Sequence, residues 1–225
     1  MALLTYADIT NRVLAIIGKS DTTTRNRIKD SINNGYNDFV TRELWPFRES
    51  TDYITTIAST QEYTLATEMS DIDAQNILSV AIQGESARKL NYMPFNQLRS
   101  LYPDFDQGGT GLPTMYYIRD GAIGFYLSPG SVYSVAVDYY IVPTALSADA
   151  DTPIIPANYR EALVHYALSD EHDFNTDPDL AVKAMNTYEN FVAKARNNLL
   201  AQPVDSGNFV IKGPADFVNH TDIGY

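Results

Sequence analysis

The spacing of apolar residues changes twice along this chain of 225 residues, and that change constrains its fold more than any other feature. Apolar side chains recur at helical spacing near both ends, whereas residues 51–142 carry short runs of β-branched and aromatic residues with a period of two. The first pattern is typical of amphipathic helices and the second of half-buried strands. The sequence therefore predicts an α+β fold.

A short amphipathic helix is predicted near the N-terminus, over residues 5–17. Thr5 is its candidate N-cap, Asp8 follows three residues later as in a capping box, and Gly18 stands where the helix should end.

A longer helix is predicted from about Thr23 to Leu44, because Pro46 prevents its continuation. Gly35 lies inside this helix, where glycine costs about 1 kcal/mol relative to alanine. We therefore expect another helix to approach the backbone closely at Gly35.

The middle of the chain predicts an antiparallel sheet. Asp120-Gly121 is a tight hairpin signal because both central positions of such a turn need positive φ, and Ser128-Pro129-Gly130-Ser131 marks the next turn. The predicted strands are Tyr53–Ile57, Tyr63–Leu65, Ile77–Ile82, Met115–Arg119, Ala122–Leu127 and Val132–Val142.

Two more helices are predicted after the β-rich segment. One runs from Pro156 to about His172, and the next begins with Asp177 as N-cap and Pro178 at the first helical position. The apolar stripe of the second helix is Leu180, Ala184, Tyr188, Phe191, Ala195 and Leu199.

The composition shifts after Pro203 to Gly, Pro, Asn and Asp with isolated apolar residues. Such a segment cannot build a core of its own, so we expect an extended tail that docks on a partner chain; the alternative is a disordered end. The candidate docking residues are Phe209, Val210, Ile211, Phe217, Val218 and Tyr225.

The net charge of −12 bears on what the protein can bind. The first 48 residues are slightly basic, so the acidic excess lies in the remainder of the chain. Affinity for duplex DNA comes from lysine and arginine that release counterions from phosphates. The charge therefore argues against tight DNA binding but is compatible with DNA that slides past.

Neither cysteine nor a long apolar run occurs in the sequence. Disulfides and thiolate metal ligands are therefore excluded, and no segment approaches the roughly 20 apolar residues of a membrane span. We expect a protein made in the cytosol, with no membrane partner.

The polar clusters do not match the spacing that catalysis or metal binding requires. His165 and His172 are seven residues apart, whereas zinc helices place the pair four apart, and residues 170–177 are typical of a solvated helix end. The paired acids at 71/73, 104/106 and 149/151 lie beside turn residues, and no nucleophile elbow or phosphate-binding loop is present. We therefore assign no catalytic, cofactor-binding or metal-binding residue.

Basic residues are concentrated in the second helix and just after it. They predict either an exposed helix face or contact with an acidic partner surface, such as a neighbouring copy of the chain. The candidates for a subunit interface are Arg25, Arg27, Lys29 and Arg42, with Arg48 nearby.

The order of elements and several local sequences resemble the head-to-tail adaptor family of tailed bacteriophages, also called neck, connector or head-completion proteins. The resemblance covers about residues 5–200, and it rests on the order of its motifs rather than on any one of them. These motifs are Arg27–Phe39, Leu44–Phe47, Tyr63–Leu65, Gly111–Ile118, Phe125–Pro129, Asp138–Tyr140, and Pro153–Pro156 leading into Tyr159–Leu163.

The resemblance implies a non-enzymatic structural protein of the virion. It implies a four-helix bundle built from residues 1–48 and 151–202, a β-rich insertion at residues 49–150 between helices two and three, and a tail at residues 203–225 that binds the portal. It further implies a ring, usually of twelve copies, in the neck between portal and tail or tail-nozzle protein. The acidic lumen of such a ring would repel the phosphates of passing DNA.

Two alternatives remain open from the sequence. One is a different tail or baseplate component. The other is a glycan-binding or hydrolase module in which tyrosines of the β-rich segment stack on sugar rings, and it predicts a pocket with a carboxylate of high pKa.

Overall fold

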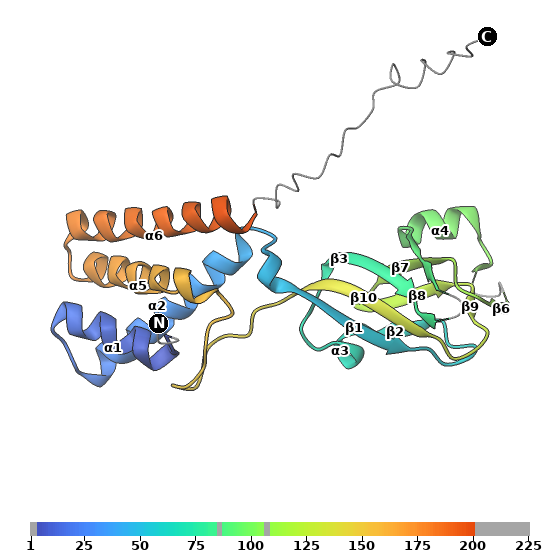
Figure 1. Cartoon of the computed structure of the whole chain (residues 1–225), viewed down its shortest axis with the longest axis horizontal. Coiled ribbons are helices and arrows are strands. Elements are labelled where there is room, and N and C mark those ends of the chain that lie inside the picture. The colour runs from blue at the N-terminus through green and yellow to red at the C-terminus, as the bar shows by residue number, and fades with distance from the viewer. Residues whose placement is uncertain (1–3, 85–86, 106–108, 201–225) are drawn as a thin grey trace, which may run out of the picture.

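A computed structural model of the chain describes residues 4–84, 87–105 and 109–200. Two parts lie end to end: helices from both ends of the described chain form one part, and the strands form the other (Figure 1). The α+β class with antiparallel sheets is therefore confirmed. Two connections join the parts, residues 42–48 and residues 142–156.

The helical part contains α1 (Tyr6–Ile17), α2 (Thr22–Thr41), α5 (Glu161–Phe174) and α6 (Pro178–Leu199). The capping box of α1 is present, because the Thr5 side chain accepts from the Asp8 amide and the Asp8 carboxylate accepts from the Thr5 amide. Gly18 ends α1 in the left-handed conformation, at φ 68°. Short 3₁₀ turns at Pro46–Arg48 and Ala157–Tyr159 adjoin the connections between the two parts.

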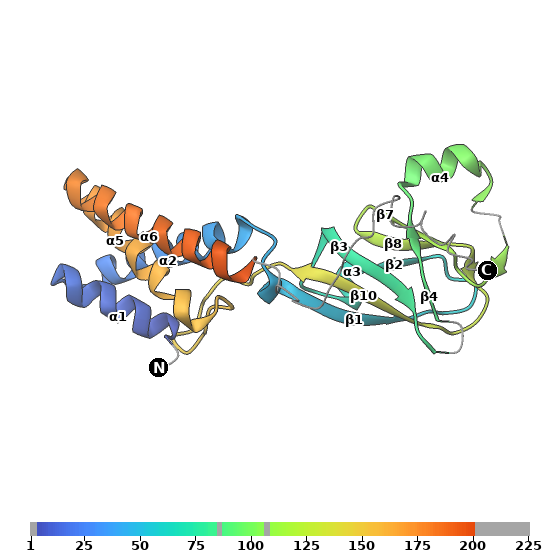
Figure 2. The same ribbon diagram turned by 45° about the horizontal axis from the view of Figure 1, so that its top comes forward.

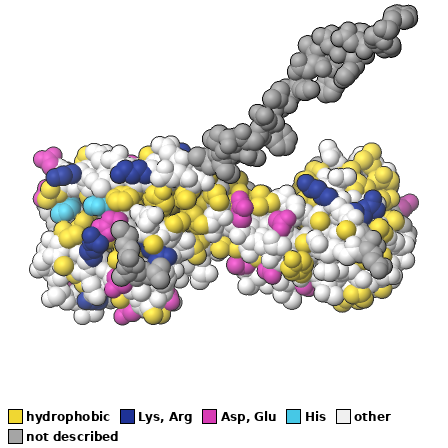
Figure 3. Space-filling view, in the orientation of Figure 1, with side chains coloured by type: hydrophobic (Ala, Val, Ile, Leu, Met, Phe, Trp, Pro, Cys, Tyr) yellow, Lys and Arg dark blue, Asp and Glu magenta, His cyan; other side chains and the backbone are white. Residues whose placement is uncertain are grey.

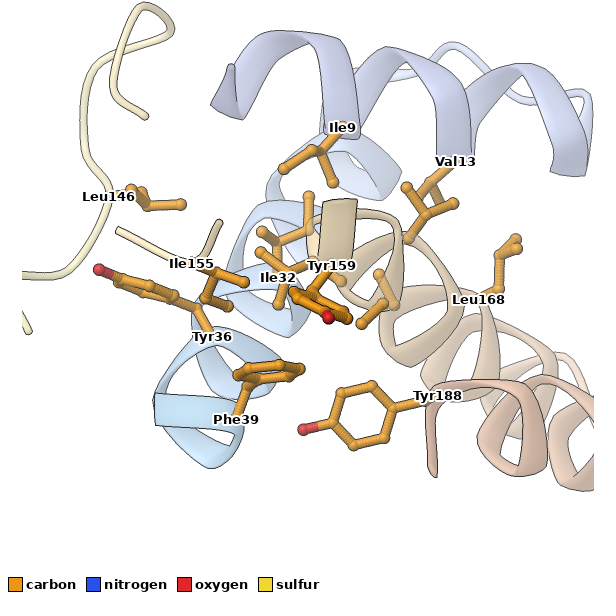
Figure 4. Close-up of a cluster of buried hydrophobic side chains, with 14 of the residues drawn as sticks. Ile9, Val13, Ile32, Tyr36, Phe39, Leu146, Ile155, Tyr159, Leu168 and Tyr188 are labelled. Atoms are coloured by element: carbon orange, nitrogen blue, oxygen red, sulfur yellow. The ribbon is translucent and has the colours of Figure 1, made fainter. Parts of the chain in front are cut away.

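The four helices share one apolar core (Figure 4). Ile9 and Val13 of α1, Ile32 and Phe39 of α2, and Tyr188 of α6 point into it. Burial of each such side chain contributes about 1.5–3 kcal/mol, which far exceeds what helix propensity supplies. This shared core holds the ends of the chain together.

Gly35 on α2 lies beneath the Tyr166 ring of α5. A Cβ atom at Gly35 would stand 2.6 Å from Cγ of Tyr166. The predicted close approach of another helix at Gly35 is therefore confirmed. The group of α5 that contacts the glycine is the Tyr166 side chain and not the helix backbone.

The first sheet is four-stranded and antiparallel throughout. It pairs β1 with β10, β10 with β3, and β3 with β4. Its strands are β1 (Glu49–Thr55), β10 (Ser134–Ile141), β3 (Ile72–Ile82) and β4 (Arg88–Lys89).

The second sheet has the order β2–β8–β7–β5 and carries two short helices around it. Its strands are β2 (Glu62–Thr64), β8 (Ala122–Tyr126), β7 (Met115–Arg119) and β5 (Asn91–Tyr92). The helices are α3 (Leu65–Glu68) and α4 (Phe95–Leu101), and a small pair is formed by β6 (Thr110–Gly111) and β9 (Ser128–Pro129). The β5–β7 and β6–β9 pairs are parallel, unlike the antiparallel pairing that the sequence predicts.

The β7–β8 hairpin turns at Asp120-Gly121, as predicted. Both residues have positive φ, 50° and 72°. The core of the β-rich part lies between the two sheets, where Val80 and Val137 of the first sheet meet Ile123 and Phe125 of the second. Figure 2 shows the two sheets from a second direction.

The apolar stripe of α6 is rotated from the predicted one. Leu180 is exposed, and the buried face consists of Ala181, Ala184, Tyr188, Val192 and Ala195. Asp177 stands at the N-cap with Pro178 in the first turn, but its side chain makes no capping hydrogen bond. Packing against α5 therefore decides which face of α6 is buried, and not every apolar residue of the predicted stripe lies on that face.

Candidate interaction surfaces

Arg27 lies in a buried ion pair that joins α2 to α5. Its Nε and Nη2 donate to the two carboxylate oxygens of Glu171 at 2.5 and 2.7 Å, and its guanidinium stacks 3.7 Å from the centroid of the Phe174 ring. Hydrogen bonding to Glu171 raises the pKa of Arg27 further above its usual value. Glu171 is fully buried, so the prediction of a solvated helix end at residues 170–177 is wrong at this residue.

The other three predicted interface cations also have partners within the chain. Lys29 Nζ lies 2.6 Å from Asp149, and this contact lowers the pKa of the Asp149 carboxyl. Arg42 bridges Asp38 at 2.8 Å and Glu189 at 2.6 Å. Arg25 donates to the neutral amide oxygen of Asn11. The exposed basic helix face is thus largely compensated by carboxylates of the same molecule.

The histidines and acids of residues 165–177, which the sequence does not predict to form a metal site, have separate contacts in the fold. His165 stacks on Phe191 with ring centroids 5.8 Å apart, and burial lowers the pKa of this histidine. Glu171 is engaged by Arg27. Over the residues that the structure describes, no group of three or more His, Asp or Glu side chains is arranged to hold a metal ion.

Arg48 fastens the two parts of the molecule together at their junction. Its side chain is buried and donates to the backbone carbonyls of Val40 and Ile141, with Asp73 3.4 Å away. These partners belong to α2, to the end of β10 and to β3. Sequence reasoning grouped Arg48 with an exposed basic face and missed this position.

The second connection, residues 142–156, is held against the helices by paired hydrogen bonds. The Asn33 side chain donates to the Leu146 carbonyl and accepts from its amide, at 3.0 and 2.9 Å. Backbone amides of Tyr6 and Ala7 donate to the carbonyls of Asp151 and Asp149. The connection therefore belongs structurally to the helical part.

Carboxylates gather on the β-rich part near the junction (Figure 3). The Tyr139 hydroxyl lies 2.9 Å from Asp52 and 3.0 Å from Asp71. Burial, reinforced by these two carboxylates, raises the pKa of Tyr139, so the phenol stays neutral at physiological pH. Asp138 accepts from Thr51 and Ser79 on the outer face of the same sheet.

Two surfaces expose large apolar side chains far from each other in the fold. The helical tip is formed by Ile16, Phe174 and Leu180, where α1 ends and α5 turns into α6. The β1 rim is formed by Tyr53, Ile57 and Val132, along β1 and the turn before β10. Contiguous exposed apolar patches mark contact sites, so these two groups of residues are candidate contact surfaces.

A groove of about 640 Å³ separates β3 from β7 and β5. Leu78 and Tyr92 line it and are 46% and 55% exposed, and the Tyr92 ring packs 5.4 Å from that of Tyr116. None of the described residues that line this groove is Asp or Glu. No local pattern in the sequence predicts the groove, because its walls come from strands distant in the chain.

The six predicted docking residues of the tail, Phe209, Val210, Ile211, Phe217, Val218 and Tyr225, lie outside the described residues. No described helix is both long and apolar enough to cross a membrane.

Comparison with known proteins adds one match. No curated protein matches the sequence. The family model described as SU10 adaptor protein, a phage head-to-tail adaptor family, matches residues 4–210, which include the helical part, the β-rich part and the start of the tail. This protein therefore belongs to the SU10 adaptor protein family.

Proposed function

We propose that this protein is a structural component of the phage neck that joins the portal to the tail as a ring. The observation that carries the proposal is the family match from residue 4 to residue 210, which spans nearly the whole chain. An adaptor acts through its surfaces, so its work is structural and not enzymatic. Its site of action is the virion.

In this proposal the helical part is a four-helix bundle that forms the body of each subunit. Residues 1–48 and 151–202 make the bundle, and residues 49–150 make an inserted β-rich domain. The shared helical core and the Arg48 contacts support a subunit that moves as one unit. Residues 203–225 form the tail segment.

A closed ring, with twelve copies as the expected number, requires a heterologous interface in which two different surfaces of the subunit meet. The helical tip and the β1 rim are two such surfaces, and both expose apolar side chains. Among the four predicted interface cations, Arg25 has a neutral hydrogen-bond acceptor, the Asn11 amide oxygen, where the others contact carboxylates. Arg25 is therefore the best candidate of the four to bind an acidic neighbour.

The acidic charge suits a ring that surrounds DNA. Net charge is −12, and the carboxylates near the junction are balanced by few cations of the β-rich part. A channel wall of this sign repels phosphates and lets the genome slide without adhering.

Portal binding is assigned to the tail, through Phe209, Val210, Ile211, Phe217, Val218 and Tyr225. The tail or tail-nozzle protein would bind the opposite face of the ring. A chain that ends at residue 202 should keep its fold and lose affinity for the portal. Normal portal binding by that shortened chain would remove the tail from the proposal.

A different tail or baseplate component would share this structural class but have other neighbours. The glycan-binding alternative would use the groove beside Tyr92 and Tyr116. Its hydrolase form lacks support there, because none of the described lining residues is a carboxylate that could act as acid or base.

Native mass measured by light scattering tests the proposal, with the protein alone and mixed with the portal of the same phage. A ring-sized species, alone or on the portal, is the expected result. A monomer that ignores the portal would instead call for a glycan screen.

A further inference from the structure

Strand β3 has an open edge along most of its length. One side of β3 pairs with β10 from Ile72 to Ile82. On the other side, the backbone pairing found among the described residues reaches only Val80, Ala81 and Ile82, through β4 and the Leu90 amide, while the Gln75 amide donates to the Asp73 side chain. The backbone from residue 74 to residue 79 therefore presents hydrogen-bonding groups to the groove.

This edge lacks the usual protection of an edge strand. Proteins guard exposed edges with charges or proline, because a bare edge recruits other strands. At the opposite edge of the same sheet, β1 carries Glu49 and Asp52. Residues 74–80 of β3 read Ala-Gln-Asn-Ile-Leu-Ser-Val and contain neither a charge nor a proline.

The groove beside this edge has the chemistry of a strand-binding site. Its floor and walls include Ile77, Leu78, Tyr116 and Ile118, with Lys89 as the one charged side chain among the described lining residues. Strand addition takes affinity from backbone hydrogen bonds and specificity from pockets that accept alternate side chains. A strand with apolar residues at alternate positions would fit.

The chain itself contains a sequence of this kind outside the described residues. Asn208-Phe209-Val210-Ile211-Lys212 is a β-branched and aromatic run, bounded by Gly207 and by Gly213-Pro214. In an extended conformation Phe209 and Ile211 share one face. Those two side chains are the ones that would enter the groove.

The point where the described chain ends places this run within reach of β3. Arg196, in the last turn of α6, lies 2.6 Å from Glu43, and Arg48 of the same connection lies 3.4 Å from Asp73 on β3. The end of α6 and the start of β3 thus border one connection, and Figure 1 shows them beside the junction. Residues 201–208 extend to about 28 Å, whereas residues 72–79 of a strand span about 23 Å.

We propose that residues 208–212 of each chain pair with the open edge of β3 in that same chain and insert Phe209 and Ile211 into the groove. A tether of this length holds the segment at a millimolar effective concentration, which favours its own groove over a neighbour's. The contact concerns the protein before any partner binds, so it stands apart from portal binding. A portal that takes the same residues must first displace them.

Amide hydrogen exchange of the full-length protein tests the proposal. We expect the amides of residues 74–79 that face away from β10 to exchange at least tenfold faster in the Phe209→Asp/Ile211→Asp variant than in the parent, because only these amides would gain protection from an added strand. The matched control is Phe217→Asp/Val218→Asp, which adds the same charge to the same tail and should leave those amides protected. Amides of β1 serve as the internal reference and should not change.

Two outcomes would overturn the proposal. Equal exchange of residues 74–79 in all three proteins would mean that the tail does not cover the edge. Protection that is lost when the parent protein is diluted tenfold would mean that a second copy supplies the strand. The β1 amides, which the proposal leaves unchanged, would reveal unfolding of a variant if they also exchanged faster.

Discussion

Replacement of Arg27 by methionine leaves the Glu171 carboxylate buried without its partner. Glu171 is fully buried, whereas 29% of the Arg27 side chain is exposed. Methionine keeps much of the aliphatic length of arginine and can still contact Phe174, so the change isolates the lost charge and its two hydrogen bonds.

The magnitude follows from burial of the pair. Removal of one partner from a fully buried ion pair lowers the free energy of unfolding by about 3–5 kcal/mol. Because water reaches one side of the guanidinium, we expect a smaller loss of about 2–3 kcal/mol in the free energy of unfolding. For a chain of this size that loss lowers Tm by about 5–10 °C.

Thermal and urea unfolding of four proteins would measure the effect: the parent, Arg27→Met, Glu171→Gln and the double variant. Glutamine removes the buried charge, so the double variant should be more stable than Arg27→Met alone. A loss below about 0.5 kcal/mol for Arg27→Met, or a double variant less stable than that single variant, would refute the role given to the pair.

Two further predictions concern packing and pH. Gly35→Ala should destabilise the protein by about 1–2 kcal/mol, because crowding against Tyr166 outweighs the gain in helix propensity. In a Tyr166→Ala background the same change should stabilise the protein. If urea unfolding shows that Gly35→Ala destabilises both backgrounds, the explanation is wrong. Hydrogen bonds from backbone amides lower the pKa of the Asp8, Asp21 and Asp151 carboxyls below 3.8. The ionised carboxylates therefore stabilise the folded state at pH values above 3.8. This stabilisation is lost as the pH falls through the lowered pKa values. We expect Tm to fall below about pH 4, and to fall less in Asp151→Asn. A Tm that stays constant from about pH 6 to pH 3 would show that these three carboxylates do not contribute.

Local signals in the sequence predicted the elements they directly control. The Thr5–Asp8 capping box, the Gly18 stop and the Asp120-Gly121 turn all depend on residues within a few positions of one another. Each is therefore visible in a single sequence. The boundaries of α1 and of the β7–β8 hairpin follow from them.

Contacts between distant segments were not predictable in this way. Glu171 is acidic and near a helix end, so its sequence surroundings resemble a solvated terminus; only the approach of α2 brings Arg27 to it. Arg48 is likewise buried because α2, β3 and β10 converge on it. Leu180 fits the apolar stripe of α6, yet it faces outward at the helical tip.

The candidate interaction surfaces also divide into those with a local sequence signal and those without one. The apolar tail residues stood out by composition, whereas the groove is built from β3, β5 and β7 and has no local signature. Strand β3 is also longer than the predicted Ile77–Ile82, because its first half pairs with β10 across register shifts that break the alternation of buried and exposed residues.

A reconstruction of the neck in purified virions by cryo-electron microscopy tests the central claim most directly. The helical part and the β-rich part should fit together into ring-shaped density between portal and tail, with the expected twelve copies around the DNA channel. Density for this chain at the distal end of the tail or in the baseplate, with none between portal and tail, would contradict the adaptor function.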